Sequence, residues 1–338
     1  MSTQRQEFTQ SSAWQVADLG SKEQLGMRLT ARHRDALLSA LEYRPDVPLE
    51  DLSPTSFPLA SIEPDIAQWR RILTGGEGIA LLRGLPVDEL SVEQIGRIFY
   101  GLGSYFGIAV SQSNDGEKLG HVVNLGGEDR RQRAYQSARA LNLHTDRCDI
   151  VGMLCIRPAM SGGLSGYASA LAIHNEVLRT RPDLLEPLYT GFRLHRFGEQ
   201  GDGPPLTELP VPVFSVADGE PNVVYIRGYI DLAEDEGHYT LSPPQREALD
   251  YFDEIANRPQ FRLDLQLQRG DATFTNNAAL VHRRDSFEDS ADLAARRHLL
   301  RLWLMNPQLP AIPSVRAHKS LAGITKIEGQ SIYYQGQS

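Results

Sequence analysis

The stretch from Leu141 to Asp146 constrains the fold of this 338-residue chain most strongly, because it sets two polar side chains beside a strand that has to be buried. Side chains alternate between the two faces of an extended strand, so His144 and Asp146 point the same way. The run from Ile150 to Ile156 is almost entirely apolar and predicts a buried strand. A histidine and a carboxylate next to such a strand need partners, since burying them unpaired costs free energy.

A divalent metal ion would satisfy both groups at once. One imidazole and one carboxylate leave a metal under-coordinated, and a second histidine would complete the two-histidine, one-carboxylate triad that suits non-haem Fe(II) with open positions. His282 is the candidate for this third ligand. By itself, a His-x-Asp tripeptide also arises by chance in a chain with nine histidines, so an ordinary surface or core histidine is the alternative.

Further short strands and helices are indicated along the chain. Strand-like runs lie at 78–84, 107–114, 120–125, 211–216, 221–227, 261–267, 272–282 and 297–304, and Pro212 confines the fourth of these to a sheet edge. Apolar residues at helical spacing predict helices at 30–43, 62–73, 91–100, 170–179, 182–189 and 242–256. Residues 1–28 show little periodicity and are expected to form a loosely ordered lead-in. This pattern predicts one mainly β domain, a double-sheet jelly roll with flanking helices.

Composition narrows the class of protein. The net charge of −9 removes the electrostatic basis for general nucleic-acid binding, and the short basic patch 130–133 is expected to be a solvated face. The N-terminus lacks the apolar region of a secretory signal, and no run approaches the length that spans a bilayer, so we expect a cytoplasmic location and no membrane partner. Cys148 and Cys155 would face opposite ways on one strand, which indicates no disulfide. Cys148 shares the parity of His144 and Asp146; it lies either near the metal or in the core as a small hydrophobic residue.

A second polar constellation lies near the C-terminal end of the predicted strands. In the run from Arg296 to Leu304, alternation places Arg297 and Arg301 on one face of an otherwise apolar strand. A buried guanidinium stays charged and needs a carboxylate, ideally in bidentate geometry. Either a ligand supplies this carboxylate, or the protein does through Asp271 or Glu288.

Taken together, these motifs resemble a known family. His144-Thr145-Asp146, the distal His282 after Gly270-Asp271 and the strand with Arg297 and Arg301 resemble the Fe(II)- and 2-oxoglutarate-dependent dioxygenases of the taurine dioxygenase and 2,4-dichlorophenoxyacetate dioxygenase group. The element from Gly162 to Ser165 is similar to the Gly-Gly-x-Thr element of that group, with serine in place of threonine. The resemblance runs from about Gly78 to Leu304.

The resemblance implies a fold and a division of roles. It implies a double-stranded β-helix, cupin-like core over about 78–305. Residues 1–60 lie outside the resemblance and are expected to form a helical extension. His144, Asp146 and His282 would hold Fe(II), and 2-oxoglutarate and O2 would take the remaining positions. Arg297 would bind the distal carboxylate of 2-oxoglutarate with the hydroxyl of Ser165 as a second donor, and Arg301 would reach the cosubstrate or an anionic substrate. Oxidative decarboxylation would release succinate and CO2 while the substrate is hydroxylated, desaturated or oxidatively cleaved.

The substrate itself is read less directly from the sequence. Candidates for its pocket are Gln112, Asn114, Arg227 and the pair Asn276-Asn277, and the polar stretch from Gly126 to Ala138 is a candidate lid. The asparagines could instead cap a turn, and Arg227 could be a surface charge. With Arg301, Arg227 would favour a small anionic or amino-acid-like metabolite. A jelly-roll metalloenzyme without 2-oxoglutarate and a non-catalytic binding protein are the alternatives, and a homo-oligomer is left open.

Overall fold

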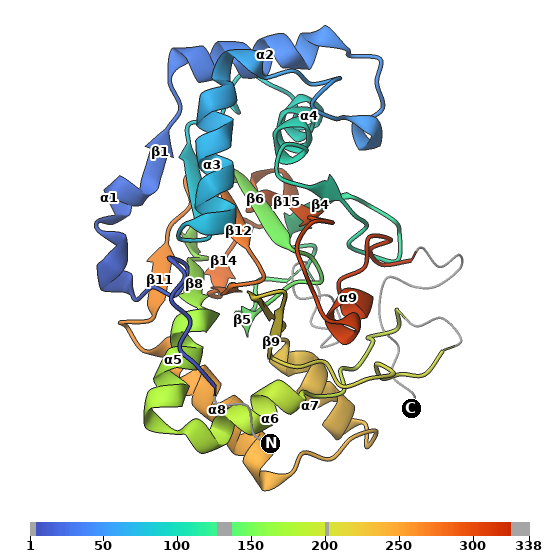
Figure 1. Ribbon diagram of the computed structural model, residues 1–338. Coiled ribbons are helices and arrows are strands. Elements are labelled where there is room, and N and C mark those ends of the chain that lie inside the picture. Colours follow the sequence, from blue (N-terminus) through green and yellow to red (C-terminus); the bar gives the residue numbers. More distant parts are fainter. Residues whose placement is uncertain (1–4, 127–136, 200–202, 326–338) are drawn as a thin grey trace.

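Two β-sheets face each other at the centre of the molecule (Figure 1). A computed structural model describes residues 5–126, 137–199 and 203–325. The larger sheet has seven strands: β1 (Gly26–Arg28), β2 (Ile79–Arg83), β12 (Ala272–Asn276), β6 (Ile150–Arg157), β15 (His298–Met305) and β3 (Ile108–Ala109) in spatial order, with β4 (Leu119–Val123) also paired to β15. The smaller sheet has the order β11 (Arg262–Leu265), β8 (Ser165–Ser169), β13 (Leu280–Arg284) and β5 (Leu141–His144). Apart from the parallel pair β1–β2, neighbouring strands are antiparallel.

Helices cover the larger sheet on its outer side. α2 (Ala31–Tyr43), α3 (Glu63–Gly75) and α4 (Val92–Gly103) share a buried cluster with Leu300, Leu302 and Leu304 of β15. Because side chains alternate along a strand, the odd-numbered residues of β15 point into the space between the sheets. The even-numbered leucines of β15 therefore pack against helices, and the odd-numbered side chains are available to a site between the sheets.

A second group of helices packs next to the smaller sheet, at the lower end of the molecule in Figure 1. It consists of α5 (Ala170–Thr180), α6 (Leu185–Thr190) and α8 (Pro243–Asn257). The remaining elements are α1 (Lys22–Leu25), α7 (Arg227–Asp235), α9 (Pro313–His318), β7 (Ser161–Gly162), β14 (Phe287–Glu288), β9 (Phe214–Ala217), β10 (Glu220–Val223) and five 3-10 turns at 16–19, 49–51, 60–62, 182–184 and 293–295.

The predicted fold class is confirmed, and so are most of the predicted elements. The six predicted helices are present, and three of them begin at the predicted capping residues: Thr30 precedes α2, Ser91 precedes α4 and Ser242 precedes α8. The Ser91 hydroxyl accepts a hydrogen bond from the Gln94 backbone N–H. The two facing sheets with antiparallel pairing form the expected jelly roll. That the chain is a single domain stays a prediction.

Three predictions about elements were wrong. The run 272–282 is not one strand, because β12 and β13 belong to different sheets and a turn at 277–279 separates them. The lead-in 1–28 is not loosely ordered over its described part: Trp14 is buried, its indole donates to the Glu77 carbonyl at 2.8 Å, and β1 joins the sheet beside β2. Helix α7 begins at Arg227, where a strand was expected to end. In each case a long-range partner decided the local structure.

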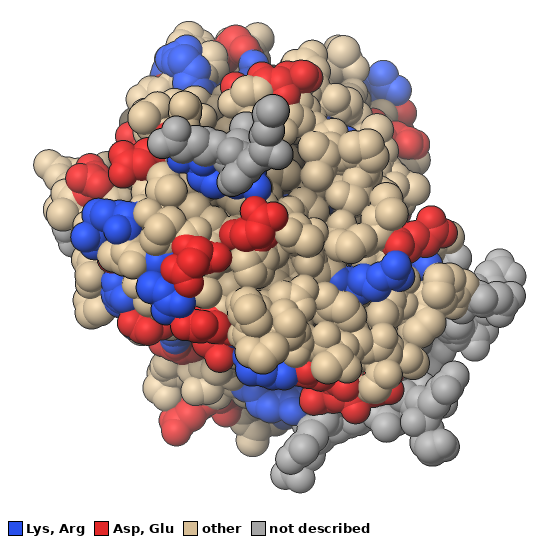
Figure 2. All heavy atoms as spheres, turned by 60° about the horizontal axis from the view of Figure 1, so that its bottom comes forward, with Lys and Arg blue, Asp and Glu red and all other residues tan. Residues whose placement is uncertain are grey.

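Most of the predicted lid, residues 127–136, lies outside the described residues. Among the helices of the described ranges, none is long and apolar enough to cross a membrane. Acidic and basic side chains are interspersed with uncharged ones on the face drawn in Figure 2. The expected absence of nucleic-acid and membrane partners, and the cytoplasmic location, stay predictions.

Candidate metal and cosubstrate site

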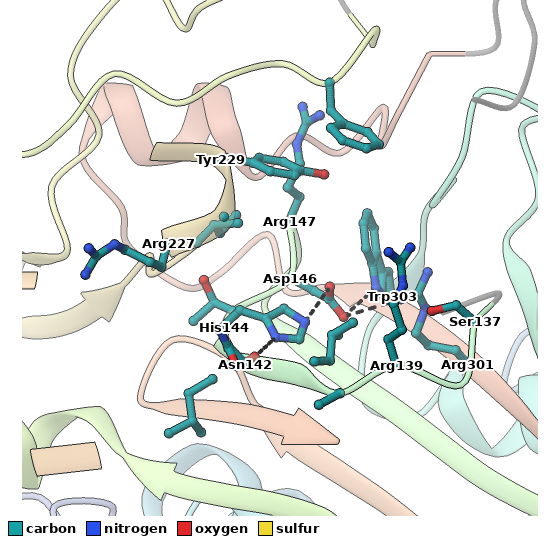
Figure 3. A pocket seen from close by; sticks show the side chains of 17 residues that line it. Ser137, Arg139, Asn142, His144, Asp146, Arg147, Arg227, Tyr229, Arg301 and Trp303 are labelled. Carbon is teal, nitrogen blue, oxygen red and sulfur yellow. Dashed lines mark hydrogen bonds and ion pairs between the residues drawn. The ribbon is translucent and has the colours of Figure 1, made fainter. Parts of the chain in front are cut away.

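The structure brings His144, Asp146 and His282 together. His144 ends β5 and lies opposite His282 of β13 in the smaller sheet, with 4.4 Å between the ring centroids. Asp146 follows two residues later, and its Oδ1 atom lies 3.8 Å from Nε2 of His144 (Figure 3). Its Oδ2 atom lies 3.6 Å from Nε2 of His282. The three candidate ligand atoms lie within 4.8 Å of one another, close enough to share one metal ion.

The hydrogen bonds and charges of these residues fit a divalent metal. The Nδ1 atom of His144 lies 2.8 Å from the Asn142 carbonyl, which can only accept, so Nδ1 carries the proton and the Nε2 lone pair faces Asp146. Burial, helped by the nearby His282, lowers the pKa of His144 to about 4, which keeps this imidazole neutral. Burial opposes ionisation of Asp146, but Arg301 and the two histidines outweigh it and hold the pKa of the carboxyl below its usual range. Two imidazoles and one carboxylate match the ligand set of non-haem Fe(II).

A second histidine cluster has the opposite hydrogen-bond pattern. His195, Glu236 and His238 also have ligand atoms within 4.8 Å of one another. However, Nδ1 of His195 accepts the Phe197 backbone N–H at 2.9 Å, so the proton sits on Nε2, 3.1 Å from Glu236. A metal would need the lone pair of that Nε2 atom, so this cluster is a hydrogen-bonded group rather than a metal centre.

Two residues that the ligand motif did not include hold Asp146. The indole N–H of Trp303 donates to Asp146 Oδ2 at 2.9 Å. Asn277 accepts the Asp146 backbone N–H at 3.1 Å and donates to the Asp146 carbonyl at 2.6 Å. Sequence reasoning missed Trp303, although its parity with Arg301 on β15 was a usable signal. It placed Asn277 in the substrate pocket, whereas this side chain is fully buried and bonded to the backbone of Asp146.

A small cavity of about 60 Å³ adjoins the triad. The triad, Ser165, Tyr167, Arg284, Arg297 and Arg301 are among the residues that line it. Arg297 is 4% exposed, and within the described ranges its guanidinium makes no hydrogen bond; it lies over the Phe287 ring, 5.0 Å from the ring centre. Burial lowers the pKa of Arg297. A buried guanidinium without a carboxylate partner, in a cavity that reaches the triad, fits an anionic ligand.

The internal partners considered for Arg297 are engaged elsewhere. Asp271 forms an ion pair with Arg83 at 3.0 Å, and the Glu288 carboxylate accepts a hydrogen bond from Ser161 at 2.9 Å. Arg297 instead uses its backbone N–H, which donates to Asp289 at 2.6 Å. The alternative of an internal pair with Asp271 or Glu288 is therefore wrong.

The glycines before Ser165 make room for Arg297. Gly162 and Gly163 have φ angles of +73° and +70°, a backbone conformation that side chains disfavour. A Cβ atom on Gly163 would lie 3.3 Å from Nε of Arg297. Ser165 starts β8 directly after this turn and is buried on the same cavity.

Arg301 lies between the small cavity and a larger one. Its Nε donates to Gln112 Oε1 at 2.6 Å, and its Nη1 is 4.0 Å from Asp146 Oδ2. Gln112 is fully buried and donates in turn to the Arg301 carbonyl at 2.9 Å. Gln112 and Asn114 line neither cavity, so their assignment to the substrate pocket was wrong; Gln112 orients Arg301 instead.

The larger cavity, of about 470 Å³, opens on the outer side of the triad and is drawn in Figure 3. Arg139, Arg147, Phe197, Tyr229 and Trp303 are among its lining residues. Arg227 also borders it, but its guanidinium is paired with Asp231, Asp250 and Asp253 at 2.7–3.3 Å and extends away from His144 (Figure 3). Asn276 donates to the Leu73 carbonyl and accepts from Ala278, which is the turn-capping alternative. Asn276 therefore has no place in the pocket, and Arg227 is structural.

Cys148 packs in the core. Its thiol is fully buried beside Trp303, Val110 and Val151. Burial and the nearby Asp146 raise the pKa of this thiol well above its usual value, so it stays protonated. The interpretation of Cys148 as a small buried hydrophobic residue is confirmed.

Comparisons with known proteins agree with this geometry. The family model "Taurine catabolism dioxygenase TauD, TfdA family" matches residues 46–303. The FR-33289 synthase of Streptomyces rubellomurinus is 31% identical over 304 residues, 88% of this chain and 89% of that protein. The taurine hydroxylase-like protein SAT17 of Stachybotrys chartarum is 29% identical over 76% of this chain and 69% of its own length. A structure of asparagine oxygenase with Fe(II), hydroxyasparagine and succinate has a TM-score of 0.68, with 18% identity over 89% of this chain and 99% of the other.

These matches settle the family and the reaction class. The expected recognition, the enzyme class and the cofactors Fe(II), 2-oxoglutarate and O2 are confirmed. Nothing in them favours a metalloenzyme without 2-oxoglutarate or a non-catalytic binding protein. The chain belongs to the TauD/TfdA family and is an Fe(II)- and 2-oxoglutarate-dependent dioxygenase that acts on a small molecule.

Proposed function

We propose that His144, Asp146 and His282 hold the Fe(II) of this dioxygenase. The observation that carries the assignment is the protonation pattern of the triad: the Nε2 lone pair of His144 faces an ionised Asp146 that is 8% exposed. The His195 cluster, which has a similar spacing of ligand atoms, lacks this pattern. The buried carboxylate and the two imidazoles can therefore share one cation.

Arg297 and Ser165 are the proposed anchor for 2-oxoglutarate. The small cavity runs from the triad to the guanidinium of Arg297, so a dicarboxylate could reach both ends. When bound, the Fe(II) and 2-oxoglutarate pair activates O2, with release of succinate and CO2, for oxidation of a C–H bond of the substrate. The residues of this chain supply placement: Arg297 fixes the far carboxylate, and Trp303 orients Asp146.

The substrate we propose is a small anionic or amino-acid-like metabolite bound in the larger cavity. Arg301 reaches this cavity next to the triad, and Gln112 holds its guanidinium in one orientation. Arg139 and Arg147 add positive charge to the same wall, although Arg147 is paired with Glu199. The hydroxyasparagine in the asparagine oxygenase structure is a molecule of this class.

The outer wall of the cavity is preformed and aromatic. The rings of Phe197 and Tyr229 stack with centroids 5.6 Å apart and an angle of 10° between their planes. Phe197 has a φ of +51°, and its backbone N–H is held by His195 at 2.9 Å. Such a strained residue persists where its surroundings hold it, and this wall would contact the hydrocarbon part of the substrate, away from its charged end.

The proposal is tested under anaerobic conditions. Fe(II) and then 2-oxoglutarate are added to metal-free protein, and the weak visible charge-transfer band of the chelate is recorded for the wild type and for Asp146→Ala. We expect the band only in the wild type. His238→Gln, in the second histidine cluster, is the matched control and should keep both the iron stoichiometry and the band.

Each other outcome removes a defined part of the proposal. Iron binding without a band would overturn the assignment of 2-oxoglutarate to the small cavity. A full band in Asp146→Ala would remove this carboxylate from the ligand set, and loss of iron in His238→Gln would move the site to the other cluster. Once the band is established, succinate release over a panel of amino acids, sulfonates and phosphonates identifies the substrate class.

A further inference from the structure

The metal-ligand residue Asp146 lies on a loop, not on a strand. β5 ends at His144 and β6 starts at Ile150, and in the described segment between them only the backbone of Asp149 bonds to a neighbouring strand, through its N–H to the Leu304 carbonyl at 3.1 Å. Thr145 is held by Tyr225, whose carbonyl accepts the Thr145 N–H at 2.7 Å and whose N–H donates to the Thr145 hydroxyl at 2.9 Å. The position of the Asp146 carboxylate therefore depends on what holds the rest of this loop.

Asn277 is the main support of this loop. Besides its two bonds to Asp146, its amide donates to the Cys148 carbonyl at 2.7 Å, and its backbone N–H donates to the Asp149 carbonyl at 2.8 Å. One buried asparagine thus binds three of the five residues in the segment. Any displacement of Asn277 would be passed directly to Asp146.

Lys319 lies directly behind Asn277. It is 1% exposed, and its ammonium donates to the Asn277 carbonyl at 3.4 Å and to the Asn222 amide oxygen at 2.9 Å. Burial lowers the pKa of Lys319, while Asp149 opposes this shift. Burying an ammonium costs free energy, and here the group contacts the residue that holds the Asp146 loop, which favours a role in placement.

The segment that carries Lys319 makes three more polar contacts with the same loop, two hydrogen bonds and one ion pair. The Asn306 backbone N–H donates to Asp149 Oδ2 at 2.9 Å, and Arg316 lies 3.8 Å from that oxygen. Arg147 donates to the His318 carbonyl at 3.1 Å. Residues 306–319 lie beyond the range 46–303 that the family model matches. Part of the support of the loop thus comes from residues outside the range that the family model matches.

We propose that Lys319 is a positioning residue for the metal site, which acts through Asn277 to hold the Asp146 loop. Docking of the C-terminal segment 306–319 is then coupled to iron affinity. This inference rests on the proposed role of Asp146 as a metal ligand.

The test compares Lys319→Met with Val315→Ala. Methionine keeps an unbranched apolar chain and removes the ammonium. Val315 is fully buried on α9, the helix that ends directly before Lys319, and makes no side-chain bond to Asn277. For metal-free protein we measure the Fe(II) dissociation constant under anaerobic conditions, the 2-oxoglutarate charge-transfer band and the melting temperature. We expect Lys319→Met to weaken Fe(II) binding roughly 10-fold, the lower end for groups that orient a ligand. Val315→Ala should lower the melting temperature and leave the dissociation constant unchanged.

A double-mutant cycle with Asn277→Ala provides the second measurement. If Lys319 acts through Asn277, then Lys319→Met should add little to the loss of iron affinity in Asn277→Ala. Lys319→Arg, which keeps the charge, should recover part of the affinity. Wild-type affinity in Lys319→Met, fully additive losses in the cycle, or losses that follow the melting temperature in all variants would overturn this inference alone. Failure of the wild type to bind Fe(II) would overturn both it and the proposed function.

Discussion

The indole N–H of Trp303 lies 2.9 Å from Oδ2 of Asp146 and fixes the carboxylate between His144 and His282. Replacing Trp303 with phenylalanine keeps an aromatic ring and removes this donor. We expect Fe(II) affinity to fall roughly 10-fold, as is typical when a partner that orients a metal ligand is lost. Isothermal titration of metal-free protein with Fe(II) under anaerobic conditions measures the change.

The smaller phenylalanine also leaves space in the core, and this effect has its own control. Val110 belongs to the same buried cluster as Trp303 and makes no bond to Asp146, so Val110→Ala creates a cavity there without removing the donor. It should lower thermal stability and retain iron affinity. Equal affinities for Trp303→Phe and the wild type would show that the hydrogen bond does not orient the ligand.

Arg301 on β15 and Arg297 directly before this strand should affect the kinetics of different ligands. Arg297 lines only the small cavity, whereas Arg301 lines both. Arg297→Ala leaves a carboxylate without its charged partner, so the 2-oxoglutarate concentration required for half-maximal turnover should rise roughly 10- to 100-fold. Arg301→Ala should mainly raise the KM of the substrate. Steady-state kinetics with each ligand varied in turn measure both; the reverse pattern would exchange the two roles.

A substitution at Gly163 tests the proposed role of Arg297 in binding 2-oxoglutarate without changing Arg297 itself. A Cβ atom there meets Arg297 and forces a non-glycine residue into a positive φ angle, so Gly163→Ala should destabilise the fold by about 1–2 kcal/mol and raise the 2-oxoglutarate requirement. Gly219 has a φ of +82° with open space around its Cβ position. Gly219→Ala should therefore lower the free energy of unfolding in urea denaturation but keep the wild-type requirement for 2-oxoglutarate. If both variants changed the requirement equally, the contact with Arg297 would not matter.

The triad and the buried arginines could be predicted because strand alternation is a local rule. His144 and Asp146, and Arg297 and Arg301, are separated by even numbers of residues. His144 and Arg301 lie on strands, Asp146 and Arg297 lie directly beside those strands, and all four line the same cavity. The predicted fold class follows from the same periodicity. These residues needed no knowledge of distant partners.

The remaining pocket residues could not be predicted because their partners lie far away in the sequence. Arg227 is neutralised by Asp250 and Asp253, and Gln112 binds Arg301, 189 residues later. A polar residue near a predicted site looks the same in the sequence whether it faces a ligand or a buried partner. The turn that separates β12 from β13 was missed for this reason, since the bonds of Asn277 are to the loop 146–149.

A buried histidine far from the metal site should make the protein sensitive to acid. His174 is fully buried, and its Nε2 lies 3.0 Å from the Tyr189 hydroxyl. Burial lowers its pKa from 6.5 to about 4; Asn175 opposes the shift and Arg5 adds to it. As the pH falls from about 6.5 towards 4, the unfolded chain takes up a proton that the folded protein refuses. The stability present at pH 7.5 is therefore lost progressively in this window.

For His174 alone the loss at pH 5 should be about 2 kcal/mol, since each pH unit between the two pKa values corresponds to about 1.4 kcal/mol. Urea denaturation of metal-free protein at pH 7.5 and pH 5 measures it for the wild type, His174→Gln and Tyr189→Phe. Glutamine does not titrate, so the difference between the two pH values should shrink by this amount in His174→Gln. Tyr189→Phe removes a partner and keeps the buried imidazole, and it should retain the wild-type difference. The same difference in all three proteins would show that other groups cause the acid sensitivity.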